Sequence, residues 1–248
     1  MHYQEILPYA SLLPYLDCYW SIRTEDKAAD TSNRVVPDIC ADIIINVGED
    51  VQVSNNKNYL LRHGEIYLTG TMTTFQDTIL TSNTHLIGIR FKPFGMSSLL
   101  NIFLQGAADT IAEAEKSVFN LSALSTRQSQ VSIDSLNKYL ASRIRNQNVD
   151  RYNYIIGTIL DYNGNIPIHK LAHDHCISER QFERLFQSHL GVTAKEICNI
   201  VRFQHAFKQI KNRTHESLLD IAYTSGYYDH GHLTRHIKKY SGQPPSCL

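Results

Sequence analysis

The 248-residue sequence contains no long apolar run and no secretory leader pattern. No window reaches about 18 consecutive apolar residues, the length typical of a membrane-spanning helix. The opening residues MHYQEILPYASLLPYL lack the basic segment and uninterrupted apolar stretch of a signal peptide. The five cysteines are scattered and never form a C-x-x-C pair, which argues against a disulfide framework and a zinc ribbon. We therefore expect a cytoplasmic protein without membrane contact.

Sequence motifs of the common enzyme classes are also missing. There is no G-x-S-x-G, Walker loop or dinucleotide fingerprint. Asp38 and Asp42 stand four residues apart. They could form a carboxylate pair for general acid–base catalysis or lie at the polar edges of a turn. The second role is the more common one for such residues. The sequence favours a protein that is not an enzyme and that needs no cofactor.

The sequence has no net charge, but its charges are unevenly distributed. Residues 1–150 carry 12 lysines and arginines against 16 aspartates and glutamates, whereas residues 151–248 carry 12 against 8. Nine of the 12 histidines also fall in the last 98 residues. A basic C-terminal part beside an acidic N-terminal part favours nucleic acid as a partner.

The first ninety residues alternate between apolar, β-branched runs and turn-rich pieces. Short strands are expected at 41–47, 65–72 and 85–91. Strands of this length and spacing predict a small antiparallel barrel or sandwich.

Helical spacing replaces the strand pattern after Pro93, first at 97–104 and 122–145 and then throughout the C-terminal part. The polar segment NQNVDR, at 146–151, lacks an apolar period and predicts a boundary. We therefore expect an α+β protein. Its β-rich domain would occupy residues 1–148, with helices from about residue 96, and an all-α domain would occupy residues 149–248.

The C-terminal part contains a repeat, since segment 168–194 matches segment 218–245 with one extra residue in the second turn. The matched pairs are Leu171 with Ile221, Ala172 with Ala222, Phe182 with Leu233, Phe186 with Ile237, and Gly191 with Gly242. Each copy predicts a short helix, a turn, and a longer helix that begins at Ser178 or Asp229 and ends at the glycine. Such a unit is a helix-turn-helix, although a plain α-hairpin repeat has the same pattern.

The outer faces of the two longer helices favour DNA reading over a merely solvated surface. The outward residues are Arg180, Arg184 and Gln187 in the first copy and Gly231, Arg235 and Lys238 in the second. In the first copy they lie about 140–200° from the apolar Phe182 on a helical wheel. Arg184 and Arg235 thus occupy matching positions on the exposed faces of the two helices.

The histidines of the second copy raise the question of a metal site. His232 and His236 stand four residues apart, on one face of a helix. The HLTRH segment has Leu233 where a metalloprotease motif has its general base, and His230 points elsewhere. A second cluster, at 173–176, falls in a turn. We expect no metal, with His232 beside the reading face and His236 near the buried edge.

The order LAHDHCISERQFERLFQSHLGVTAKEICNIVRFQHAF, then LLDIAYTSGYYDHGHLTRHIKKYSGQPP, resembles the DNA-binding domain of the AraC/XylS family of bacterial transcription regulators. The similarity covers about residues 152–248. It includes the family's R-x-x-x-A pattern at Arg202 and Ala206 and its closing G-x-x-P at Gly242 and Pro245.

The resemblance implies helix-turn-helix units at 168–191 and 218–242, joined by a long helix at 194–211. Each longer helix would enter the major groove of double-stranded promoter DNA. The residues that match base-reaching positions are Arg180, Gln181, Glu183, Arg184 and Gln187 in the first unit, and His230, His232, Thr234, Arg235 and Lys238 in the second.

The N-terminal segments RVVPDICADIIINV and LIGIRFKPFGMSSLL resemble the sensor domain of one AraC subgroup, although Ile39 replaces a usual glycine. This resemblance implies a barrel-like, cupin-like domain that binds a small effector or pairs two subunits in a homodimer. The candidate effector-binding residues are Trp20, Asp38, Asp42, Tyr67, Phe75 and Phe91. Core packing is the more common fate of such aromatic residues.

These observations predict a sequence-specific, DNA-binding transcriptional regulator that responds to a small-molecule effector. RNA polymerase would be its partner at the promoter. The alternative from another class is a helical interaction module that does not bind DNA, attached to a small β-domain enzyme.

Overall fold

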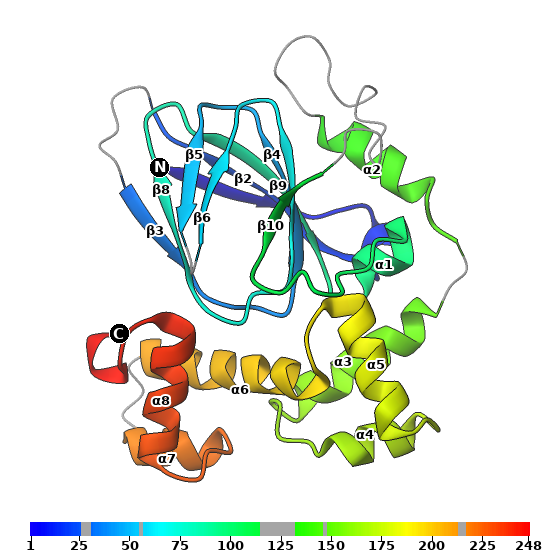
Figure 1. Cartoon of the computed structure of the whole chain (residues 1–248), viewed down its shortest axis with the longest axis vertical. Coiled ribbons are helices and arrows are strands. Elements are labelled where there is room, and N and C mark those ends of the chain that lie inside the picture. Colours follow the sequence, from blue (N-terminus) through cyan, green and yellow to red (C-terminus); the bar gives the residue numbers. More distant parts are fainter. Residues whose placement is uncertain (26–30, 55–56, 115–131, 146–147, 213–216) are drawn as a thin grey trace.

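The computed structural model of the chain has a β-rich upper part and a helical lower part (Figure 1). The structure describes residues 1–25, 31–54, 57–114, 132–145, 148–212 and 217–248. The strands come first along the chain, and from Val149 onward the described elements are all helical. The predicted order, a β-rich part followed by an all-helical part, is confirmed.

A six-stranded antiparallel sheet forms the centre of the β-rich part, in the order β1-β2-β9-β4-β7-β10. In that order its strands are His2–Ile6, Leu16–Arg23, His85–Phe91, Ala41–Asn46, Ile66–Thr69 and Ile111–Glu113. The register places Trp20 opposite Gly88 and Asp42 opposite Arg90. Cross-strand partners lie side by side on one face of a sheet, so these four residues share a face.

A second antiparallel sheet of four strands has the order β3-β8-β5-β6. Its strands are Thr31–Val35, Gln76–Leu80, Val51–Ser54 and Asn58–Leu61. Trp20 of the first sheet and Val53 and Leu80 of the second belong to one buried cluster, so the sheets face each other. Of the predicted barrel or sandwich, the structure has the sandwich: among the described residues the two sheets remain separate, and β1 and β10 are the edges of the larger one.

The other face of the six-stranded sheet is covered by short helices. These are the 3₁₀ helix η1, α1 and α2, at Ala10–Leu12, Gly95–Leu100 and Ile133–Ala141. Strand alternation puts Tyr19 on this face and Trp20 on the opposite one. The Tyr19 hydroxyl donates to Asn137 Oδ1 of α2 at 3.1 Å. Of the helix expected at 122–145, residues 122–131 lie outside the described residues.

The helical part contains two similar helix pairs, α4 with α5 and α7 with α8, joined by α6 (Figure 1). The bounds of α3 to α8 are Val149–Asp161, Ile168–Asp174, Glu179–Leu190, Ala194–Lys211, Leu218–Thr224 and His230–Ser241, and a 3₁₀ turn follows at Pro245–Cys247. Helix α3 begins inside the polar segment where the sequence predicted a boundary.

The ends of α5 and α8 have the predicted caps. The backbone N–H of Gln181 donates to Ser178 Oγ at 3.3 Å, and that of His232 donates to Asp229 Oδ1 at 2.6 Å. The closing residues Gly191 and Gly242 have φ angles of 76° and 75°, in the left-handed region that favours glycine. Residues adjacent to each helix therefore determine where it starts and stops.

The two parts of the chain share a hydrophobic core. Phe94, which is 1% exposed, comes from the turn before α1 and packs among residues of the helical part. Its ring stacks on Tyr152 of α3, with centroids 4.5 Å apart, and meets Phe186 of α5 edge-on at 5.2 Å. Ile39 belongs to the same cluster. Two residues of the β-rich part thus complete the core of the helical part.

Candidate nucleic-acid interface and internal cavity

Helices α5 and α8 lie at opposite ends of α6, and both point their C-terminal ends toward the β-rich part (Figure 1). Hydrogen bonds from the β-rich part hold these ends; for example, Thr71 Oγ1 donates to Leu190 O at 2.9 Å, and Arg34 Nη1 donates to Ser241 O at 3.3 Å. Recognition helices of helix-turn-helix proteins contact bases through their N-terminal residues. The β-rich part therefore leaves the relevant ends of both helices uncovered.

Most residues that the sequence proposed as DNA contacts are exposed. The exposed ones are Arg180, Gln181, Arg184, Gln187, His230, Arg235 and Lys238, and the half-buried ones are Glu183, His232 and Thr234. Glu183 has a role inside the fold, since its Oε2 accepts a hydrogen bond from Ala194 N at 3.3 Å. A carboxylate at the start of α6 also interacts favourably with the helix dipole. The arginines of both helices make no such internal contact among the hydrogen bonds of the described residues.

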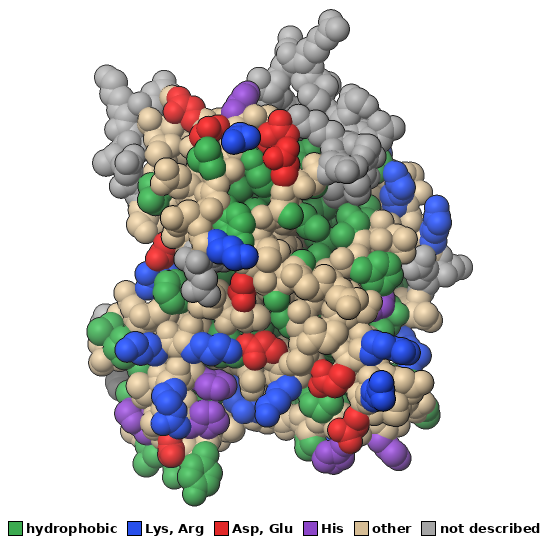
Figure 2. Space-filling model, viewed as in Figure 1, with side chains coloured by type: hydrophobic (Ala, Val, Ile, Leu, Met, Phe, Trp, Pro, Cys, Tyr) green, Lys and Arg blue, Asp and Glu red, His purple; other side chains and the backbone are tan. Residues whose placement is uncertain are grey.

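Basic side chains concentrate on the half of the molecule that carries these helices. Figure 2 shows Lys, Arg and His side chains across the lower half of the surface, over the region of α5, α6 and α8, with some acidic side chains between them. The charge imbalance seen along the sequence therefore has a spatial counterpart. Such a surface attracts a polyanion.

His232 and His236 form part of an aromatic cluster. Their ring centroids are 4.8 Å apart, and Tyr227 meets both rings edge-on at 5.2 and 5.3 Å. Burial, followed by the nearby positive charges of His232 and Lys239, lowers the pKa of His236 to about 4. In the part of the chain that the structure describes, no three His, Cys, Asp or Glu side chains are grouped so as to hold a metal ion.

His236→Leu should make the protein less sensitive to acid. Since the pKa of His236 falls from 6.5 in the unfolded chain to about 4 in the folded one, the unfolded chain binds more protons between these values. This contribution to stability is present above about pH 6.5 and is lost as the pH falls toward 4. Leucine occupies the matching position of the first helix pair, at Leu185.

The measurement is the fall in Tm between about pH 7.5 and pH 5, which should be smaller in His236→Leu than in the parent protein. His169→Leu, at an exposed position of α4, is the control. An equal fall in all three proteins would contradict the assignment.

A cavity of about 540 Å³ lies between the two sheets. Apolar side chains form most of its wall, among them Ile22, Val53, Leu61 and Leu86. Its volume is in the range of small-molecule binding sites, about 300–1,000 Å³.

Three of the six effector candidates line this cavity, namely Trp20, Asp38 and Asp42. The other three lie elsewhere. The Tyr67 hydroxyl accepts from Arg62 N at 2.7 Å, and Phe91 is fully buried in the core beneath α1 and α2. Phe75 lies at the boundary with the helical part, where a Cβ placed on Gly242 would come within 2.8 Å of its ring.

One end of the cavity is polar. Arg90 Nε lies 3.4 Å from Asp42 Oδ1, and Arg90 Nη1 lies 3.7 Å from Asp38 Oδ2. Trp20 Nε1 donates to Asp42 Oδ1 at 2.6 Å. Burial raises the pKa of Asp42 to about 6, against the opposing effect of Arg90. Two carboxylates therefore face one guanidinium across distances too long for strong hydrogen bonds.

Sequence reasoning missed most of the cavity wall, including the polar residues Arg90 and Gln204. Arg90 interrupts the apolar strand HLIGIRF, and a charged side chain within a largely buried strand is a signal of a polar site. Gln204 belongs to α6, and its Nε2 donates to Pro37 O at 3.2 Å. No local pattern could have placed a residue of the helical part beside a cavity of the β-rich part.

Residues 70–76, which we call the bracket segment, connect the cavity with the helical part. Gly70, Met72 and Gln76 line the cavity, whereas Thr71 bonds to the end of α5. One short segment thus has side chains in both environments.

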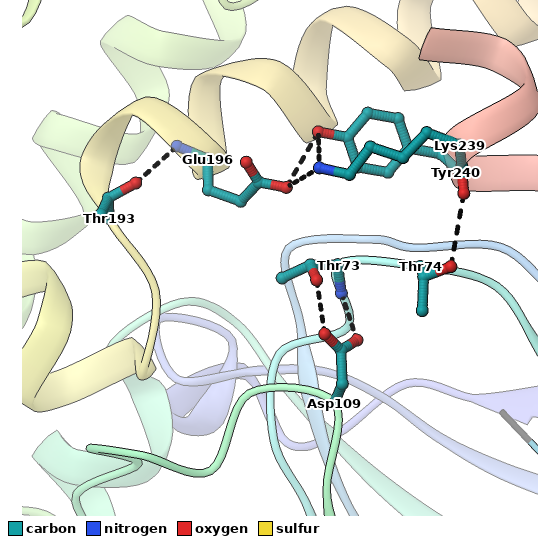
Figure 3. A network of polar contacts seen from close by, with 7 residues as sticks. All are labelled: Thr73, Thr74, Asp109, Thr193, Glu196, Lys239 and Tyr240. Carbon is teal, nitrogen blue, oxygen red and sulfur yellow. Dashed lines mark hydrogen bonds and ion pairs between the residues drawn. The ribbon is translucent and has the colours of Figure 1, made fainter. Parts of the chain in front are cut away.

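The same segment also contacts the end of α8. Thr74 Oγ1 donates to Lys239 O at 3.3 Å (Figure 3). Phe75 lies against Gly242, with the Arg34 guanidinium carbon 4.3 Å from its ring centroid. The bracket segment therefore touches the C-terminal ends of both longer helices.

Figure 3 shows how the bracket segment and α8 are held in place. The backbone N–H of Thr73 donates to Asp109 Oδ1 at 2.6 Å, and the Thr73 hydroxyl bonds to the same carboxylate. Lys239 Nζ and the Tyr240 hydroxyl both donate to Glu196 Oε1 of α6, at 2.7 and 2.9 Å. These contacts tie α8 to the helix that joins the two pairs.

Two families of domains match the chain. Residues 4–113 match a domain of unknown function (DUF6597), and residues 171–248 match a helix-turn-helix domain. The sequence matches none of the curated proteins. In the described part of the chain, no helix has both the length and the apolar character needed to cross a bilayer.

Several solved structures are similar to the chain. ToxT from Vibrio cholerae is 13% identical, covering 88% of this chain and 96% of its own, with a TM-score of 0.45. Wild-type ToxT from Vibrio cholerae strain SCE256, with a bound unsaturated fatty acid, is 14% identical over 91% and 96%, with a TM-score of 0.45. A regulator with an AraC-type DNA-binding domain, from Chromobacterium violaceum, is 19% identical over 37% and 82%, with a TM-score of 0.35.

Proposed function

We propose that this chain, which carries a helix-turn-helix domain of the AraC type, reads adjacent segments of one promoter with α5 and α8. A ligand in the cavity would control this binding. The proposal goes beyond DNA binding itself in two ways. It assigns base contacts to particular residues, and it assigns the cavity a regulatory ligand.

The observation that carries the first assignment is the common orientation of α5 and α8. Both project their N-terminal ends away from the β-rich part, from opposite ends of α6 (Figure 1). Helix α6 has 18 residues and is therefore about 27 Å long, which is compatible with two recognition helices about one turn of DNA apart. Arg184 and Arg235, exposed at matching positions, are suited to bidentate contact with guanine.

The second assignment rests on two segments that reach from the cavity to the helical part. Val36 and Asp38 line the cavity, while Val36 and Ile39 pack against the helical core. The bracket segment lines the cavity and touches the ends of α5 and α8. A ligand that displaces either segment alters contacts that position both recognition helices, which is the differential interaction that regulation requires.

We further propose that the protein acts in the cytoplasm, where bound DNA places it beside RNA polymerase, and that it pairs with a second copy on DNA. Strands β1 and β10 are the edges of the six-stranded sheet, and edge strands can pair with a second chain.

Binding of the full chain to pooled genomic fragments tests the proposal. We expect enrichment of a few fragments, and affinity for them should fall about tenfold or more between roughly 50 and 200 mM salt, because lysine and arginine contacts release counterions from DNA. The measurement is a gel shift followed by sequencing of the retained DNA. Retention of all fragments alike, or of none, would contradict sequence-specific reading.

A further inference from the structure

The side-chain charges of the cavity wall do not balance. Four charged side chains belong to its wall: Arg34, Asp38, Asp42 and Arg90. Arg34 is neutralised outside this group, because its Nε and Nη2 bond to the two carboxylate oxygens of Asp77, each at 2.7 Å. Asp38 and Asp42 remain, and Arg90 is the one cation within ion-pair distance of them among the described residues. Met1 also belongs to the wall, but its amino group forms no ion pair with either carboxylate.

The excess charge is poorly compensated by the protein. Asp42 receives one short hydrogen bond from Trp20, and Asp38 receives one from Cys40 N at 2.9 Å, whereas both contacts of Arg90 with the carboxylates exceed 3.3 Å. Arg90 Nε is buried and makes no hydrogen bond among the described residues. A buried carboxylate without a matched cation is costly, and a ligand that brings positive charge removes that cost.

The wall beyond the polar end indicates what kind of molecule could fill the rest of the cavity. Beyond the polar end the wall consists largely of apolar side chains, including Val35, Ile44, Met72 and Ile111. A ligand that fills the cavity therefore needs an apolar body. Trp20 also lines the cavity and donates its Nε1–H to Asp42, so its indole ring stands at the border between the two regions.

We propose that the cavity binds an organic amine, with its ammonium group at Asp42 and Asp38 and its apolar body between the two sheets. This inference rests on the proposed regulatory role of the cavity and names the class of ligand. An organic carboxylate would place a second like charge beside Asp42, and a neutral alcohol would leave the excess charge uncompensated.

The proposal also implies a dependence on pH. Since burial raises the pKa of Asp42 to about 6, its negative charge and the affinity for an amine should decline as the pH falls below 6. The titratable or charged groups around Asp42 are Asp38 and Cys40 before β4, Arg90 on β9, Tyr3 and Glu5 on β1, and Asp17 and Cys18 on β2. Of these, Arg90 is closest and remains charged throughout.

The test compares matched head groups on the same apolar body, with the full chain and isothermal titration calorimetry. The probes are hexylamine, cyclohexylmethylamine and tryptamine, each beside the carboxylate and the alcohol that carry the same apolar group. We expect at least one amine to bind about tenfold more tightly than its matched alcohol, with weaker binding still for its carboxylate. Asp42→Asn should abolish this preference. Asp161→Asn, an equal change of charge at an exposed site of α3 outside the cavity wall, should retain it.

Two results would overturn the proposal: no binding of any amine at millimolar concentration, or equal affinity of amine, alcohol and carboxylate in the parent protein. A carboxylate or alcohol that binds the cavity and alters DNA affinity would disprove the amine but leave the regulatory role intact. The proposed function itself is tested separately by the gel shift with genomic fragments, which contains no amine, alcohol or carboxylate probe. If the parent protein selects no fragment there, the proposed function is disproved.

Discussion

Replacing both Arg184 and Arg235 with alanine should nearly abolish selective DNA binding. Each arginine is exposed on the outer face of a recognition helix, and loss of a bidentate contact with guanine costs about 1–3 kcal/mol. The two positions lie in different helix pairs and share no partner among the described residues, so their effects should add. We expect the double variant to lose about a hundredfold or more in affinity for the selected fragments.

A fluorescence-anisotropy titration against a selected fragment and against unrelated DNA measures this effect. Each single variant should also relax the preference at one base position, because the lost contact reads one base pair. Arg62→Ala, at an exposed turn of the β-rich part, is the matched control for lost positive charge. If the double variant binds the selected fragment as tightly as this control does, α5 and α8 are not the reading helices.

Replacing Phe94 with alanine should lower the free energy of unfolding by about 3–5 kcal/mol, the usual range for removal of a buried aromatic side chain. The ring is 1% exposed and packs against both Tyr152 and Phe186. Phe94 has a φ of 64°, and alanine retains its Cβ, so the backbone strain persists and the change mainly reports the lost packing.

Urea unfolding followed by both fluorescence and circular dichroism measures the change. Phe94 comes from the β-rich part of the chain but packs in the core of the helical part, so it links the two. Without its ring the two parts should unfold in two separate transitions. Leu160→Ala, on α3 but 45% exposed, is the control and should change stability little. An effect of Phe94→Ala no larger than that of the control would mean that the shared core does not couple the two parts.

Much of the helical part was predictable because its signals are local. Ser178 and Asp229 stand directly before the helices that they cap, and Gly191 and Gly242 directly after them. The apolar period of each helix also separates its buried from its exposed side within a single turn. For the same reason the exposure of Arg184 and Arg235 follows from the sequence alone. The hydrogen bond that Ala194 N of α6 donates to Glu183 does not follow from it, because the two residues belong to different helices.

The cavity could be predicted only in part, because the residues that surround it come from distant strands. Of the candidate effector-binding residues, Trp20, Asp38 and Asp42 line the cavity, whereas the aromatic Tyr67, Phe75 and Phe91 lie elsewhere. Which side of a strand faces the cavity depends on register, and register is a property of paired strands.

By itself the sequence determined the repeated helix pairs, their caps and their exposed basic faces, since each depends on residues within a few positions of one another. Only the tertiary structure decided that the sheets stay open, that Arg90 lies opposite Asp42, and that Gln204 of α6 reaches the cavity. It likewise decided that residues 70–76 touch the ends of both α5 and α8. These features require segments far apart in the chain to meet, and no local periodicity encodes where they meet.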